Sequence, residues 1–369
     1  MNEATFVLAL LQEHYQVHAV TLEYLSDFSV EEGYLVYRIR HPDGQSWTAR
    51  VYRRDRPVLD WFRYFYPWST QDASDWLLTR AATLVYLEQQ GYPAPQVIRT
   101  RAGHLLAMAD GWCSLITTFI EGTVLQPTLE QLRLLGAALG RLHTVRSNTV
   151  TPDFPPIGKS NWYPEHALLT GLASLASMEP KLSEEWLPFL AAFRQTFQRI
   201  GARPELPMVI IHADGWAANA VQTKANQVVL IDWDGAGLGL AILDVGRLLL
   251  ECHLDSNLPP DVSLAWHIQP DASRILAVVE GYAQQRLPTS AELEMLLDAT
   301  RFSVAFIGTL HMSQMAQKVP RDQAWVRGME RRWARLQNRW AASSDIALLA
   351  RRRFEQLHTE MRDAQERPR

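Results

Sequence analysis

The sequence predicts an α+β chain of two lobes, a small N-terminal lobe built on an antiparallel sheet and a larger, mainly helical C-terminal lobe. Strand patterns separated by short turns dominate the first third of the chain, and helical apolar spacing dominates the part after Gly122. Two short apolar runs in the second part, 208–211 and 228–231, are each followed by aspartate. We expect lobes over 1–116 and 123–369, joined by 117–122.

The small lobe contains patterns for two helices and several strands. A helix is expected over 5–15, and a second over 75–90, because Gly91 is a helix-ending residue and Pro93 lies just beyond it. Pro42-Asp43-Gly44 marks a hairpin turn between two of the strands. The predicted strands are 18–25, 34–41, 46–53, 97–99, 104–107 and 115–119.

The large lobe is predicted to be mostly helical. Apolar residues recur at helical spacing over 128–143, 184–200, 244–252, 272–285 and 291–316. The tail, 321–369, holds twelve arginines against seven acidic residues and one apolar stripe. We expect it to form a helix docked on its own lobe, with membrane-surface or partner binding as alternatives. The stripe consists of Trp325, Met329, Trp333, Leu336 and Trp340.

Composition indicates a globular protein of the cytoplasm. The 369 residues are 47% hydrophobic and 21% charged, and the net charge of −4 argues against a nucleic-acid partner. Cys113 and Cys252 have neither metal-ligand nor redox spacing. Neither a basic leader nor an apolar stretch approaching 18 residues is seen, so we expect no membrane association. Composition leaves a monomer and a homodimer both open.

The clearest chemical signal lies around the two apolar runs. The run 208–211 predicts a buried strand that delivers Asp214 onto a loop, where its carboxylate can accept a hydroxyl proton. Residues 220–231 predict a hairpin that folds Asp232 back beside Asn219. Mg²⁺ prefers oxygen ligands and takes few carboxylates, so these two residues suit it. The spacing therefore predicts a Mg-nucleotide phosphoryl-transfer site.

These residues resemble those of a known family. The pattern His-x-Asp-x-x-x-x-Asn over 212–219, followed by apolar-Asp-Trp-Asp, is similar to that of the aminoglycoside phosphotransferase and choline kinase family, relatives of protein kinases. The segment 135–143 resembles its helix ending in Leu-His, and 119–122 resembles its interlobe hinge. The segment 237–246 resembles its Gly-Asp-Pro segment, although Leu240 replaces the usual aspartate. The resemblance covers roughly residues 20–255 and implies a bilobal protein-kinase-like fold.

The resemblance also implies ATP and Mg²⁺ as cofactors and a role for each matching residue. Asp214 would be the catalytic base, and His212 and Asp244 would support its loop. The Mg²⁺ ligands would be Asn219 and Asp232, with Asp234 near a second ion. The nucleotide would contact Arg50 and the backbone of Thr118, Phe119 and Ile120.

The small lobe departs from the family in its phosphate-binding residues. Arg50 occupies the position of the usual lysine, a role that a guanidinium can share, but Arg80 falls where a glutamate is expected to orient it. Either Asp75 or Glu31 orients Arg50, or Arg80 binds phosphate itself, or the register differs. The loop 26–33, expected to cover the phosphates, has one glycine.

The sequence predicts an ATP-dependent phosphotransferase that acts on a hydroxyl of a small molecule, such as an amino alcohol, a sugar or an aminoglycoside. The alternative is a nucleotide-binding pseudokinase with a regulatory role. The aromatic run 61–68 is expected to be a packed helix rather than a lid, and 161–165 is a candidate substrate contact. Either an acidic wall for a cationic amine or simple surface placement would explain Glu165, Glu251, Asp255 and Glu280.

Overall fold

The structure is a computed structural model that divides into two compact units. It describes residues 3–25, 34–53, 73–109, 111–146, 157–178, 184–203, 206–254, 268–317 and 323–366. Unit 1 comprises 1–121 with 149–158, and unit 2 comprises 122–148 with 159–369. The loop 26–33 and the aromatic run 61–68 lie outside the described residues. Among the described helices, none is both long and apolar enough to cross a membrane.

Unit 1 is built on a five-stranded antiparallel sheet, as the sequence predicts. Its strand order is β1-β2-β3-β5-β4, and β2 and β3 form the expected hairpin, in which Gly44 has a φ of 88°. The predicted strand 97–99 is wrong, because Val97 makes a single bridge to Thr117. The strand predicted over 104–107 is present but shifted, since the edge strand begins at Ala107. The elements are α1 (Glu3–Tyr15), β1 (Thr21–Tyr24), β2 (Tyr34–Arg40), β3 (Ser46–Arg53), α3 (Ala73–Gln89), β4 (Ala107–Ala109) and β5 (Trp112–Thr118).

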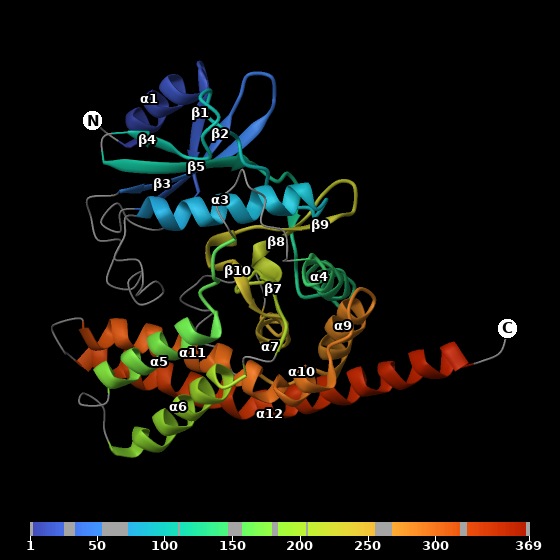
Figure 1. Ribbon diagram of the computed structural model, residues 1–369. Helices are drawn as coiled ribbons and strands as arrows, with labels where there is room; N and C mark the ends of the chain where they lie inside the picture. The colour runs from blue at the N-terminus through green and yellow to red at the C-terminus, as the bar shows by residue number, and fades with distance from the viewer. Residues whose placement is uncertain are drawn as a thin grey trace. The chain divides into compact units, whose positions relative to one another are not determined.

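Helices α1 and α3, both in the described part of unit 1, cover opposite faces of its sheet (Figure 1). Leu10 and Leu11 of α1 pack against alternate strand residues such as Ile39 and Val51, all at most 1% exposed. Residues one position along β3 therefore face α3, and there the ring of Tyr52 lies 5.2 Å from that of Trp76. This alternation also places Arg50 on the α3 face of the sheet.

Unit 2 is mainly helical, with two small sheets of order β10-β7 and β6-β8-β9. Its strands are β6 (Thr123–Val124), β7 (Met208–Ile211), β8 (Ala220–Gln222), β9 (Val228–Leu230) and β10 (Gly237–Leu240). Its α-helices are α4 (Leu129–Leu142), α5 (Pro164–Met178), α6 (Leu187–Gly201), α7 (Ala241–Glu251), α9 (Ala272–Ala283), α10 (Ser290–Glu294), α11 (Leu296–Gln317) and α12 (Gln323–Glu366). The 3₁₀ turns are η3 (Glu184–Trp186), η4 (Ala217–Asn219) and η5 (Trp233–Gly235).

Two predictions about helices were wrong. Helix α5 was not expected, and the predicted helix 291–316 is in fact two helices that meet at Met295. The break follows a capping box in which the Thr289 side chain accepts from the backbone of Glu292, which in turn bonds back to Thr289. This box fixes the start of the short α10, which ends before α11 begins.

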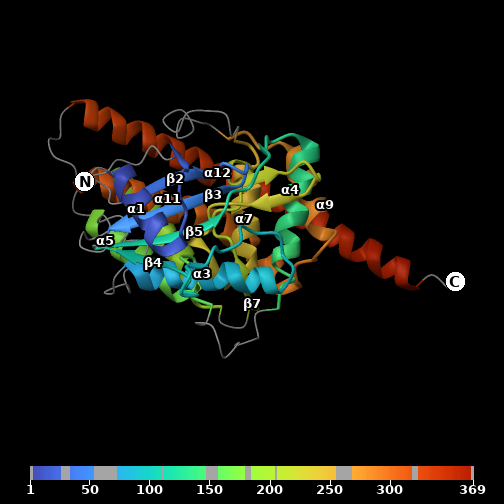
Figure 2. The same ribbon diagram turned by 90° about the horizontal axis from the view of Figure 1, so that it is seen from above.

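The C-terminal helix α12 docks on its own unit, as predicted for the arginine-rich tail (Figures 1 and 2). The Trp333 ring stacks on Trp186 at 4.5 Å, and Trp340 contacts Phe189 and Phe193 of α6. Trp333 is 6% exposed. Burial of such large rings is worth several kilocalories per mole, which explains why this helix packs despite its charge.

Candidate active site

A sharp turn after β7 presents Asp214. Strand β7 pairs with β10, and its last residues Ile210 and Ile211 are fully buried. Ala213, one residue before the candidate base, has a left-handed φ of 64°. A non-glycine residue in this conformation costs about 1 kcal/mol or more, so the surrounding structure must hold it in place.

Asp244 of α7 holds this turn. Its two carboxylate oxygens accept hydrogen bonds from the backbone N–H groups of His212 at 2.6 Å and of Ala213 at 2.7 Å. The His143 ring lies 3.2 Å from the same carboxylate and 2.9 Å from the Tyr282 hydroxyl. Asp244 and His143 are both fully buried. The turn is therefore fixed by charge-assisted hydrogen bonds that water does not reach.

His212 also supports the turn. Its Nε2 lies 2.9 Å from the carbonyl oxygen of Ile231, and its ring packs edge-on against Trp233. The side chain is completely buried, and this burial lowers the pKa of the histidine despite the nearby carboxylates. A buried neutral imidazole joins the two segments that carry Asp214 and Asp232, as the proposed supporting role requires.

The hairpin of β8 and β9 returns the chain to Asn219, so the hairpin prediction is confirmed. Ala220 pairs with Leu230, and the Ile231 N–H donates to the Asn219 carbonyl at 2.9 Å. Asp232 follows directly, with a left-handed φ of 62° and a half-buried side chain. Asp234, also half-buried, lies in the η5 turn that comes next.

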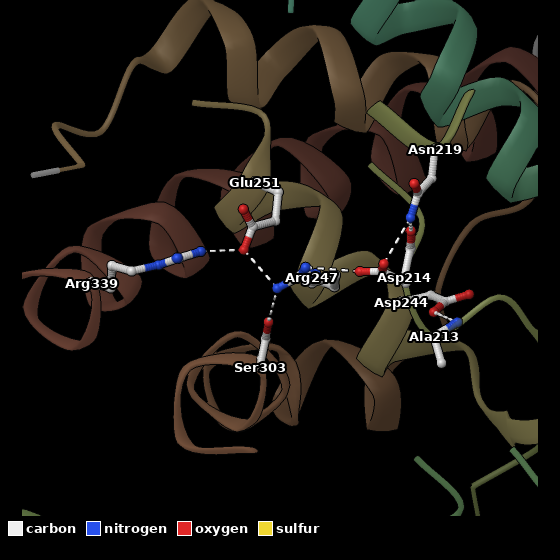
Figure 3. A network of polar contacts seen from close by, with 8 residues as sticks. All are labelled: Ala213, Asp214, Asn219, Asp244, Arg247, Glu251, Ser303 and Arg339. Atoms are coloured by element: carbon white, nitrogen blue, oxygen red, sulfur yellow. Dashed lines mark hydrogen bonds and ion pairs between the residues drawn. The ribbon is translucent and has the colours of Figure 1, made fainter. Parts of the chain in front are cut away.

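The Asp214 carboxylate is held on both oxygens (Figure 3). Arg247 of α7 donates to Oδ1 at 2.8 Å, and the Asn219 amide donates to Oδ2 at 2.7 Å. Burial raises the pKa of Asp214, Arg247 lowers it and Asp232 raises it, and the resulting pKa lies above the ordinary value. The side chain is still 38% exposed, so water moderates that rise. A carboxylate that is oriented, reachable and more basic than usual suits proton abstraction.

In unit 1, two arginines lie near the α3 face of the sheet. Arg50 is in the middle of β3, opposite Leu115 of β5. Arg80 of α3 is only 3% exposed, and its guanidinium lies 5.7 Å from the Trp76 ring centroid. Glu31 lies outside the described residues. The three explanations offered for this pair of arginines stay predictions.

The segment 117–121 is fastened within unit 1. The Thr118 N–H donates to Gln96 at 2.8 Å and the Phe119 N–H to Ser46 at 3.0 Å. The Arg38 guanidinium lies 3.9 Å above the Phe119 ring and pairs with Glu121. Two of the amides expected to meet a nucleotide therefore already donate to protein carbonyls.

Comparison with known proteins identifies the family. The model of the phosphotransferase enzyme family matches residues 30–296, well over half of the chain. The chain belongs to this family. The match includes the turn at Asp214, the hairpin and all of α9, and it ends at the beginning of α11.

The curated relatives of this chain include bacterial homoserine kinases. The chain is 33% identical over 221 residues to the homoserine kinase of Methylobacterium radiotolerans, covering 57% of this chain and 61% of that one. It is 26% identical over 212 residues to that of Pseudomonas aeruginosa, covering 56% and 60%. The match thus spans about three fifths of the length of these curated relatives.

Solved structures confirm the protein-kinase-like fold of the chain. An amicoumacin kinase in complex with AMP-PNP, Ca²⁺ and Ami has a TM-score of 0.66 at 14% identity, with 91% of this chain and 94% of that one covered. A choline/ethanolamine kinase family protein from Mesorhizobium loti has a TM-score of 0.58 at 16% identity, with 94% and 99% covered. At such identities the likeness establishes the fold alone.

Sequence patterns did not indicate one group at the candidate site, the guanidinium of Arg247. Its only signal was its position three residues after Asp244, which places it on a neighbouring face of the same helix. His143 was noticed only as the end of a helix pattern, but it bonds directly to Asp244. Contacts between segments so far apart in the chain cannot be read from local spacing.

Other residues predicted to contact the substrate have structural partners within the protein instead. Trp162 is 3% exposed and packs on Phe302 of α11, so its ring belongs to the core. Glu251 is buried against two arginines, which excludes it from an acidic wall. Glu280 pairs with Arg133 and Arg353, and Glu165 pairs with Lys159 on the surface. Asp255 lies outside the described residues.

Proposed function

We propose that the chain is an ATP-dependent phosphotransferase that transfers the γ-phosphate to a hydroxyl group of a small molecule. The observation that carries the proposal is the meeting of Asp214, Asn219 and the Asp232 segment at the end of β7, fixed by buried hydrogen bonds. In phosphoryl transfer, positioning and electrostatics do most of the work, and this site offers both.

In this proposal Asp214 accepts the proton of the acceptor hydroxyl. The acceptor oxygen attacks the γ-phosphorus while the bond to the leaving ADP breaks, and the proton passes to the Asp214 carboxylate. Arg247 and Asn219 keep that carboxylate oriented, each from one side. The proton transfer is worth about 10² to 10⁴ in rate when the base is correctly placed.

The residues at the hairpin fit a magnesium ion bound together with the nucleotide. Asn219 and Asp232 offer oxygen atoms as metal ligands from neighbouring segments, and Asp234 lies two residues after Asp232. In the described part of the chain no group of three or more His, Cys, Asp or Glu side chains could hold a metal alone. Phosphate oxygens and water would therefore complete the octahedron that Mg²⁺ requires. When bound, the ion would neutralise charge on the transferred phosphate.

The remaining parts of the nucleotide site belong to the proposal as well. Arg50 would bind phosphate, and residues 117–122 would form the hinge that receives adenine. Because the Thr118 and Phe119 amides donate to protein carbonyls, the adenine contacts fall on their carbonyl oxygens and on Ile120. We place the enzyme in the cytoplasm, as a monomer or a homodimer.

The names of the relatives support a proposal for the acceptor class. Curated relatives are named homoserine kinases, and neighbouring structures include an aminopropanol kinase at a TM-score of 0.52. Both names denote small amino alcohols, so an amino alcohol is the first acceptor to test. The pseudokinase alternative has no observation in its favour, since a protein that only binds nucleotide has no need for an oriented base.

An acceptor screen tests the proposed function. Purified protein with MgATP is offered homoserine, aminopropanol, choline, sugars and aminoglycosides, and release of ADP is followed together with the mass of the product. We expect one class to yield a product heavier by one phosphoryl group in the wild type and no product in Asp232→Asn. Absence of product with every acceptor, in protein that binds MgATP, would favour the pseudokinase.

A further inference from the structure

A chain of ion pairs, which we call the relay, runs from Asp214 to the C-terminal helix, entirely within unit 2 (Figure 3). Arg247 donates from one nitrogen to Asp214 at 2.8 Å and from the other to Glu251 at 2.7 Å. The same nitrogen that bonds Glu251 lies 3.4 Å from the Ser303 hydroxyl of α11. The Glu251 oxygen that accepts from Arg247, Oε1, also accepts from Arg339 of α12.

The inner members of this chain are removed from water. The side chains of Glu251, Arg247 and Arg339 are 2%, 10% and 15% exposed. A buried charge is costly unless it is paired, and removal of one partner leaves the next uncompensated. Two carboxylates alternate here with two guanidiniums, so the four charges cancel. A change at Arg339 therefore alters what Glu251, and then Arg247, can hold.

The geometry of Arg247 makes it more than a fastener between helices. A guanidinium is a rigid planar fork, so a contact on one nitrogen fixes the direction of the other. Glu251 and Ser303 together fix one arm, and the other arm then points at Asp214 Oδ1. With Asn219 on Oδ2, the rotation of the carboxylate is set from both sides.

We infer that Arg247 is a positioning residue for Asp214, and that Arg339 of the C-terminal helix, acting through Glu251, sets the orientation of Arg247. This rests on the proposed function in so far as Asp214 is the base. Arg339 and Ser303 lie beyond residue 296, where the family match ends. Through Arg339 alone, the C-terminal helix thus contributes to the positioning of the base as well as to packing.

The test compares Arg339→Ala with a matched change on the same helix. Arg353 also pairs from α12 with a glutamate of a neighbouring helix, Glu280 of α9 at 3.4 Å, but has no contact with the relay. We expect Arg339→Ala to lower kcat about tenfold, with KM for MgATP within about twofold, because base orientation is used in the transition state and not in nucleotide binding. Arg353→Ala should leave kcat within about twofold.

A conservative variant and a double mutant separate positioning from stability. Arg339→Lys keeps the charge against Glu251 and should recover much of kcat. In an Arg247→Ala background, Arg339→Ala should lower kcat by less than about twofold, because the relay is already cut. Equal effects of Arg339→Ala and Arg353→Ala on kcat, or fully additive effects in the double mutant, would overturn the inference.

A crystal structure of Arg339→Ala decides the matter without turnover. We expect the Arg247 fork to have turned away from Asp214 in the variant. An unchanged contact between Arg247 and Asp214 would overturn the inference whether or not kcat changes in the variant. A wild type that yields no product with any acceptor would overturn the proposed function, while the crystal structures would still test the relay.

Discussion

Asp214 and Asp244 have the same side chain, but their surroundings suit them to different roles. Asp244 is fully buried and accepts from two backbone N–H groups and from His143, so its oxygens are committed to the turn. Asp214 is 38% exposed and is held by side chains alone. A committed carboxylate stabilises structure, whereas an oriented and accessible one can exchange a proton.

The buried histidines make stability depend on pH. Burial lowers the pKa of His143, with Asp244 opposing the effect, and lowers the pKa of His212 and His253 as well. His143 faces Asp244 on α7 and Tyr282 on α9, with Arg286 and Glu292 nearby. Below about pH 6.5 these histidines bind protons in the unfolded chain, whereas in the folded chain they stay neutral to lower pH. The free energy of unfolding therefore falls as pH falls.

We therefore expect the free energy of unfolding to drop between pH 6.5 and 5.5, by up to about 1.4 kcal/mol per pH unit for each histidine. His143→Gln should remove one histidine's share of this slope, measured by urea titration at several pH values. His104→Gln, a change at an exposed position, serves as the control. An unchanged slope in His143→Gln would show that this ring carries no part of the pH dependence.

Local sequence was enough to predict the turn at Asp214, the hairpin and the positions of Asn219 and Asp232, because strand and turn patterns act over a few residues. It was not enough for Arg247 or for the burial of Glu251. Those depend on helices α7, α11 and α12 meeting in space, and a charged residue on a helix is usually solvated. A surface position was therefore the more probable prediction for Glu251, but the packing of the three helices buries its side chain.

At the scale of elements, α4 and α9 lie side by side (Figures 1 and 2). Glycines allow this approach: a Cβ on Gly140 would lie 2.7 Å from the Tyr282 carbonyl oxygen, and one on Gly281 would collide with the Arg133 carbonyl. The contact matters for the site because α4 ends in His143 and α9 carries Tyr282. Their closeness brings the two rings together behind Asp244.

Gly281→Ala tests this packing by the sign of its effect. In an open helix the change would stabilise by about 1 kcal/mol, whereas overpacking here should destabilise by about 1 to 3 kcal/mol. We expect a lower midpoint in urea and weaker activity, since the pair of rings is displaced. Ser273→Ala, at an exposed position on the same helix, should change stability by less than about 0.5 kcal/mol. A stabilising Gly281→Ala would contradict close packing.

The boundaries of elements were less predictable than their existence. The edge strand of unit 1 begins at Ala107 rather than His104, because pairing with β5 decides where a strand starts. Helix α5 was missed since its face is buried against α6 and α11, partners that the local pattern does not reveal. The capping box at Thr289 marks the start of α10, close to the predicted start at 291, but no comparable signal marks the break at Met295.

At the scale of the whole molecule, the residues that the proposal assigns to the reaction are divided between the two units. The base and the candidate metal ligands belong to unit 2, and the candidate phosphate arginine, Arg50, belongs to unit 1. If Arg50 binds phosphate, Arg50→Ala should weaken MgATP binding about tenfold or more, measured by calorimetry. Arg40→Ala, a change at an exposed residue paired with Glu23, is the control. Equal affinity in Arg50→Ala and the wild type would remove Arg50 from the site.

The most direct test of the central claim compares Asp214→Asn with the wild type in two assays on the same preparations. The variant keeps the shape of the side chain but loses the base, so we expect MgATP affinity within about threefold of the wild type and kcat lower by about 10² to 10⁴. Full turnover in Asp214→Asn would contradict the account, because phosphoryl transfer would then proceed without the residue around which the site is built.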